Sequence, residues 1–145
     1  MSSHQDEVFA WIAVGGFECP VEAITRIIGI QPSRTRQRGE TFRHPKGVRD
    51  VVWRESSWTL HSPLAGSVEL EAQVDALLEL IAPAIPSFRK LPTEASIHLG
   101  CAIYAYSERP AIWFTRKQIE CLASIGAGID VDVYDFTECE DDKQV

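Results

Sequence analysis

Residues 7–14 read Glu-Val-Phe-Ala-Trp-Ile-Ala-Val, a run of β-prone and apolar side chains. Successive side chains of a strand point to opposite faces, so a run that is apolar at both odd and even positions is typical of a strand inside a sheet. We therefore expect a central strand here, ended by the turn residues Gly15 and Gly16.

The segment that follows this strand has the signals of a helix. Pro20 suits the first helical position, where its missing N–H costs nothing, and Gly29 suits the end. A second helix is predicted at about 68–82 from one apolar stripe opposite a row of acids. The stripe consists of Leu70, Val74, Leu77, Leu78 and Ile81. The prolines at 83 and 86 end it, with a short extra turn over 85–91.

A third helix begins at Thr115-Arg116-Lys117-Gln118, which matches a capping box. We expect it to run to Ile125 with Ile119, Leu122 and Ala123 facing inward. The remaining β-prone runs predict a strand or bent hairpin over 51–61 and strands over 95–106, 111–114 and 129–136.

This order of elements predicts the fold class. Mixed hairpins and crossovers favour an α+β two-layer sandwich with a mixed or antiparallel sheet and helices packed on one face. We expect a ferredoxin-like sheet or an elaboration of it. The chain of 145 residues suits one domain, with a core over about 7–136 and an acidic tail over 137–145.

The positive charge is concentrated in one connection. Seven of the fourteen Lys and Arg residues lie between Arg34 and Arg54, where only Glu40 and Asp50 are acidic. This window carries about +5, whereas the whole chain carries −7, so the remainder carries about −12. Such segregation indicates a surface that faces a partner.

The spacing within this window favours an extended chain. Arg34, Arg36 and Arg38 recur at every second position, which would place their guanidinium groups on one side of a strand. Guanidinium groups match carboxylate and phosphate geometry, so we take these three with Arg43 and Arg49 as candidate binding residues. The competing interpretation is that they pair with the protein's own acids on the 68–82 helix or the tail.

A second candidate lies on the polar side of the predicted sheet. If the strands over 95–106 and 129–136 are neighbours, they would bring polar and ionisable side chains together. These are His98, Tyr104, Asp130, Asp132 and Tyr134. Such a group could be an acid–base pair or a ligand site, or simply a solvated or partner-covered face.

Composition excludes several classes of protein. No apolar run approaches the roughly 20 residues of a membrane span. The first seven residues lack the basic flank of a signal peptide, so we expect a cytoplasmic protein. The four cysteines show no ligand spacing, and we expect reduced thiols, no metal and no cofactor. No nucleophile elbow, P-loop or dinucleotide fingerprint is present.

Several short motifs together resemble those of a known family. They are Phe17-Glu18-Cys19-Pro20, Ile27-Ile28-Gly29-Ile30-Gln31-Pro32-Ser33, Arg38-Gly39-Glu40, Trp58-Thr59-Leu60, Leu122-Ala123-Ser124-Ile125-Gly126-Ala127 and Asp132-Val133-Tyr134. The set is similar to that of a bacterial family described as domain of unknown function 4279, over about residues 8–136. Cys19 departs from the Asp, Ser or Thr that the family usually has there. The resemblance implies a bacterial α+β domain and carries over no catalytic residue.

Three functions remain open from the sequence. The first is a non-enzymatic domain that binds a macromolecule, most plausibly a protein, with an immunity-type role as one form of it. The second is a ligand-binding or enzymatic domain that uses the sheet face. The third is RNA binding through the arginine-rich loop, which an overall pI of about 5.0 disfavours. We expect a protein partner and no membrane association, and we assign no catalytic residue.

Overall fold

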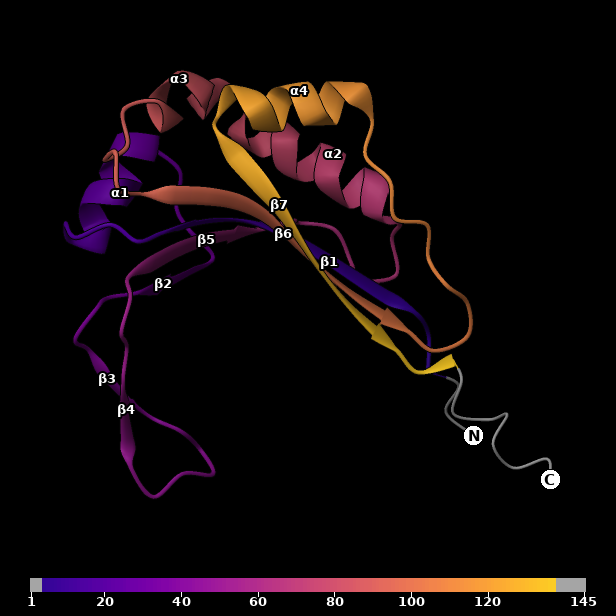
Figure 1. Cartoon of the computed structure of the whole chain (residues 1–145), viewed down its shortest axis with the longest axis horizontal. Helices are drawn as coiled ribbons and strands as arrows, with labels where there is room; N and C mark the ends of the chain where they lie inside the picture. Colours follow the sequence, from indigo (N-terminus) through magenta and orange to yellow (C-terminus); the bar gives the residue numbers. More distant parts are fainter. Residues whose placement is uncertain (1–3, 138–145) are drawn as a thin grey trace.

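The computed structural model describes residues 4–137, and a five-stranded mixed sheet organises them (Figure 1). The strand order is β2-β5-β1-β6-β7. These strands span Arg34–Arg36 (β2), Ser57–His61 (β5), Glu7–Gly15 (β1), Ser96–Ala105 (β6) and Ala127–Asp135 (β7). The pairs β2–β5, β5–β1 and β1–β6 are antiparallel, whereas the pair β6–β7 is parallel. Residues 7–14 thus form the central strand, as the sequence predicted.

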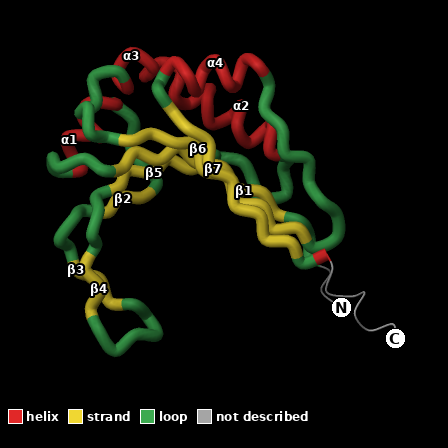
Figure 2. The backbone as a smooth tube through the Cα atoms, in the orientation of Figure 1, coloured by secondary structure: helices red, strands yellow, loops and turns green. Residues whose placement is uncertain are grey.

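All the helices lie on one face of this sheet (Figure 2). They are α1 (Val21–Ile28), α2 (Leu70–Ile81), the 3-10 turn η1 (Ala82–Ala84), α3 (Ile85–Phe88) and α4 (Arg116–Ser124). The even-numbered side chains of β1 pack against them, together with Trp58 and Leu60 of β5. Every residue of the predicted α2 stripe is buried. The α+β two-layer class with helices on one face is therefore confirmed.

One strand pairing differs from the ferredoxin-like arrangement. In a split βαβ unit another strand separates the two parallel strands. Here β6 and β7, which α4 connects, are direct neighbours, and β7 is the outer strand. At this edge Ile129 and Val133 are 43% and 51% exposed.

A second sheet, the basic arm, projects from the main one on the side opposite to the helices (Figure 1). We define the arm as residues 37–56. It is a hairpin of β3 (Thr41–Arg43) and β4 (Asp50–Val52), with Phe42 opposite Val51. The segment predicted as one strand or bent hairpin over 51–61 is therefore divided between the arm and β5.

Two sequence predictions are wrong in this part of the fold. Residues 111–114 form no strand but an irregular connection, in which Ile112 and Trp113 are 45% and 51% exposed. In α4, the inward side chains are Gln118 and Leu122, whereas Ile119 is half exposed and Ala123 is exposed. The capping box of Thr115 and Gln118 is confirmed.

Gln118 faces inward because its amide has partners there. Its Nε2 donates to the Glu71 carbonyl and to Asp75 Oδ1 on α2, while its Oε1 accepts the Thr115 N–H. A polar side chain with all these hydrogen bonds can be buried at little cost.

No helix in residues 4–137 combines the length and the apolar character that a bilayer span requires.

Candidate binding surface

The face of the sheet opposite to the helices is lined by two cross-strand rows of small and polar side chains. Residues paired across neighbouring strands point to the same face. One row runs through Arg36, Ser57, Gly15 and Ser96, and the next through Arg34, Thr59, Ala13 and His98. The two candidates from the sequence, the arginines and His98, thus share one open face.

Only two of the three predicted arginines belong to this face. Arg34 and Arg36 lie in β2, whereas Arg38 follows the strand and is exposed at the start of the arm. Arg43 and Arg49 lie further out, at the end of β3 and just before β4. The extended conformation that the two-residue spacing predicted is therefore present over 34–36.

Ser56 and Gln37 fix the base of the arm. The buried Ser56 Oγ accepts hydrogen bonds from the Arg38 N–H at 2.9 Å and from Gln37 Nε2 at 3.2 Å. Gln37 Oε1 accepts the Val21 N–H at 2.8 Å, at the start of α1. These bonds join the two ends of the arm to each other and to the helical layer.

Trp53 holds Arg36 in place above the open face. The Arg36 guanidinium carbon lies 4.0 Å from the Trp53 ring centroid, and the Phe42 ring stacks on Trp53 at 4.1 Å. A stacked ring covers one face of an indole, so Arg36 must occupy the other face. Burial and the nearby Arg34 lower the pKa of Arg36 from its ordinary value.

The arm and the sheet border an open cleft of about 540 Å³. Its floor is the end of β1, and its walls carry Arg36, Trp53 and Arg54 on one side and Ser96 and His98 on the other. Sequence reasoning did not include Trp53, Arg54, Ser57 or Ser96. A Pro-Lys-Gly turn at 45–47 between β-prone residues was the feature that could have revealed the hairpin and its paired aromatic residues.

The arginines do not pair with acids in the part of the chain that the structure describes. The ion pairs there join Arg109 to Asp135 and Arg116 to Glu120, both outside the arm. Pairing with acids of the 68–82 helix is therefore not observed. The suggested fold-back of the acidic tail concerns residues 138–145, which lie outside the described residues.

His98 and Asp132 do not form an acid–base pair. His98 lies in register with Gly128, whereas Asp132 lies in register with Ala102, four residues further along the strands. At 3.3 Å per residue this separates the two rows by about 13 Å. Within residues 4–137 no group of three or more His, Cys, Asp or Glu side chains could hold a metal.

Tyr104 and Tyr134 instead belong to an aromatic region at the far end of the open face. Their rings stack at 4.9 Å, and Phe9 contacts Tyr104 edge-on at 6.0 Å. Tyr106 and Phe136 stack in the same way one row further on. Phe9, Tyr134 and Phe136 remain about 40% exposed, so the open face offers aromatic as well as cationic groups.

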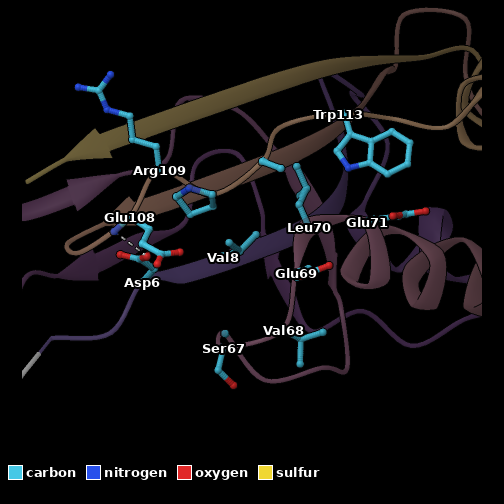
Figure 3. Close-up of a pocket in the computed structure, with 13 residues that line it drawn as sticks. Asp6, Val8, Ser67, Val68, Glu69, Leu70, Glu71, Glu108, Arg109 and Trp113 are labelled. Carbon is cyan, nitrogen blue, oxygen red and sulfur yellow. Dashed lines mark hydrogen bonds between the residues drawn. The ribbon is translucent and has the colours of Figure 1, made fainter. Parts of the chain in front are cut away.

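A second hollow, of about 350 Å³, lies between the start of α2 and the turn after β6 (Figure 3). Its rim carries Glu69, Glu71 and Glu108, and Trp113 stands at one side (Figure 3). Asp6 also lines it, but its carboxylate already accepts hydrogen bonds from Tyr106, Ser107 and Glu108. These bonds anchor the start of β1, so we assign Asp6 a structural role.

The fold and this surface define an α+β domain with one helix-covered sheet face and one open face flanked by a basic hairpin. Comparison with known families gives a match over residues 6–136 to the model described as domain of unknown function (DUF4279). The chain belongs to this family, which confirms the resemblance seen in its motifs. No curated protein matches the sequence.

Proposed function

We propose that this protein is a non-enzymatic binding protein that recognises an acidic surface of a protein partner. The basic arm and the adjoining half of the open sheet face form the recognition surface. The observation that carries this proposal is that the basic arm projects from the main sheet (Figure 1), while its arginines form no ion pair with the described acids. Complementary charge of this kind directs encounter and selects partners.

The chemistry of the surface supports a protein partner. Arg, Trp and Tyr are enriched at protein interfaces; the surface combines Arg34 and Arg36 with Trp53, and the Tyr104–Tyr134 pair lies further along the same face. Asp130 and Asp132 lie on β7 on the same face, so this face carries both signs of charge, which suits the mixed charge of a protein surface better than the uniform negative charge of a nucleic acid backbone. A bacterial, cytoplasmic protein that neutralises a toxin by covering an acidic surface is one form that this function would take.

Photo-crosslinking in cells of the source organism tests the proposal. A crosslinking amino acid at Val48, which is 94% exposed in the arm, should give a discrete protein adduct. The same group at Leu80 on α2, 44% exposed, is the positional control. The adduct should be lost in the Arg34/Arg36/Arg38→Ala variant and kept in the charge-matched Arg26/Lys90/Lys117→Ala variant.

Two results would overturn the proposal. One is an adduct that persists equally in both triple variants, because Arg34, Arg36 and Arg38 would then not determine binding. The other is an adduct that ribonuclease removes, which would assign the arm to RNA. Retention on heparin would in that case fall with salt and with the loss of the three arginines.

A further inference from the structure

The cleft at the base of the basic arm has the features of a site for one chemical group. Ala13 and Gly15 form part of its floor. Because their side chains are small, they leave space between the polar residues of the strands on either side. The hydroxyl groups of Ser57 and Ser96 stand on either side of Gly15 in the same cross-strand row. Neither hydroxyl has a hydrogen-bond partner in residues 4–137, and both can donate to a ligand.

Arg36 is the best preorganised anion-binding group in this cleft. Its guanidinium stacks on Trp53, and a side chain that is already held by such a contact loses less entropy when a ligand binds. It is partly buried, and it makes no ion pair with any described acid. A desolvated cation without a counter-ion attracts an anion more strongly than an exposed one does.

The charge of the cleft distinguishes between anions. Arg36 and Arg54 line it, Arg34 is adjacent in β2, and Glu55 contributes one acid. The nearby carboxylate of Glu55 penalises a phosphate dianion more than a monoanion. A planar carboxylate also matches the two parallel N–H groups of a guanidinium.

We propose that this cleft binds a single carboxylate of the acidic polypeptide partner at the Arg36 guanidinium, while the Ser57 and Ser96 hydroxyls, which lie two strands apart, donate to other polar groups of the same bound segment. The proposal rests on the function proposed above and identifies the group of the partner that enters. A side-chain carboxylate of Asp or Glu and a C-terminal carboxylate share this chemistry.

Amide chemical-shift titration of the ¹⁵N-labelled full chain tests the proposal with three probes. The first is hexaglutamate with both ends blocked, and the second is a Gly-Ser hexapeptide with a free C-terminal carboxylate. The third is inorganic phosphate. At least one of the two peptides should shift the amides of Gly15, Ser57 and Ser96, and which peptide does so identifies the source of the carboxylate.

Two variants separate the cleft from general charge attraction. Arg36→Lys keeps the charge and removes the fork and the stacking, and should weaken peptide binding roughly tenfold. Arg49→Lys makes the same change far out on the arm and should leave affinity within about twofold. Gly15→Ala adds a methyl group whose nearest neighbours are 3.8 and 3.9 Å away. It should fold normally and also weaken binding, because the methyl fills the floor of the cleft.

The outcomes distinguish this inference from the proposed function. Equal losses in Arg36→Lys and Arg49→Lys, or shifts confined to amides of residues 43–50, would overturn the cleft site and leave the arm as an acid-binding surface. Binding of phosphate alone would also overturn it. If neither peptide shifts any amide and Val48 gives no adduct in cells, both proposals fail.

Discussion

Trp11 lies across the open face directly over Gly100 of the neighbouring strand. A Cβ added at Gly100 would lie 2.2–2.5 Å from three atoms of the Trp11 indole, so this position needs a residue without a side chain. We expect Gly100→Ala to destabilise the protein by about 1–3 kcal/mol through overpacking. Urea unfolding monitored by circular dichroism measures the change.

Gly128 provides the matched control for this substitution. It lies on β7 in register with His98, and an added Cβ would meet nothing within 4 Å. Gly128→Ala should therefore leave the free energy of unfolding within about 0.5 kcal/mol of the wild-type value. A Gly100→Ala effect that is also within about 0.5 kcal/mol would mean that Trp11 moves aside, and that the contact with Gly100 does not constrain the fold.

Asp6 makes the stability of the protein sensitive to acid. Hydrogen bonds from the backbone of Ser107 and Tyr106 lower the pKa of its carboxyl below the ordinary value of 3.8. A folded-state pKa that is depressed contributes stability above the unfolded pKa, and this contribution is lost as the pH falls through the lower folded value. Asp135 titrates in the same direction, because Thr137 donates hydrogen bonds to it.

We expect Asp6→Asn to lower the urea midpoint at pH 7. As the pH approaches 3, the midpoints of the variant and the wild type should converge. Asn cannot carry the charge, so its hydrogen bonds with the turn no longer depend on protonation. Urea midpoints at several pH values measure this convergence. The exposed Asp130→Asn should follow the wild-type curve, and a constant gap for Asp6→Asn from pH 7 to 3 would contradict the assignment.

At the scale of the element, the arm depends on a single buried hydroxyl at its base. Ser56→Ala would leave the Arg38 N–H without its acceptor and Gln37 without one of its partners. The loss of such hydrogen bonds costs about 1–2 kcal/mol. The change should therefore speed hydrogen exchange of the Arg38 amide roughly tenfold while β1 and β6 keep their protection.

Ser67→Ala is the control, since Ser67 is exposed and outside the arm. It should change no exchange rate near the arm. Unaltered protection of the Arg38 amide in Ser56→Ala would show that the aromatic stack of Phe42 and Trp53, rather than the serine, keeps the arm in place. Amide exchange measured by NMR resolves these two possibilities residue by residue.

The helices were predictable because their apolar periodicity coincides with real burial. The α2 stripe and the Gly29 end of α1 needed only local rules, and Gly29 has the left-handed backbone that this end requires. The strand prediction for residues 111–114 was wrong because residues of high β-propensity form a strand only where a partner strand is available. The prediction of the inward face of α4 was wrong because Gln118 lies there, held by hydrogen bonds to α2 that the sequence does not reveal.

At the scale of the whole molecule, the candidate surface was only half predictable. The charge pattern identified the arginines, and the alternation over 95–106 placed His98 opposite to the core. Strand order joined these two groups: β5 and β1 lie between β2 and β6, which sets Arg34 and His98 in one row. Pairing between strands distant in sequence is decided by the packing of the whole core, so short-range patterns cannot supply it.

The arm is separable from the body of the molecule, because its contacts with the helical layer are concentrated at its base. The core is built from β1, β5, β6 and the helices, and it contains no residue of β3 or β4. We therefore expect a variant in which Asn-Gly replaces residues 41–52 to fold. Such a two-residue turn suits a short hairpin between Glu40 and Trp53.

This truncated protein should unfold cooperatively, with a melting temperature within a few degrees of the wild-type value, because the buried apolar surface of the core is unchanged. It should also lose the part of the binding surface that residues 41–52 provide, including the charges of Arg43 and Arg49. A crosslinker at His61, exposed on β5, should then capture the partner of the full chain much less efficiently. Loss of cooperative unfolding would place the arm within the folding unit, whereas undiminished capture would place recognition on the sheet alone.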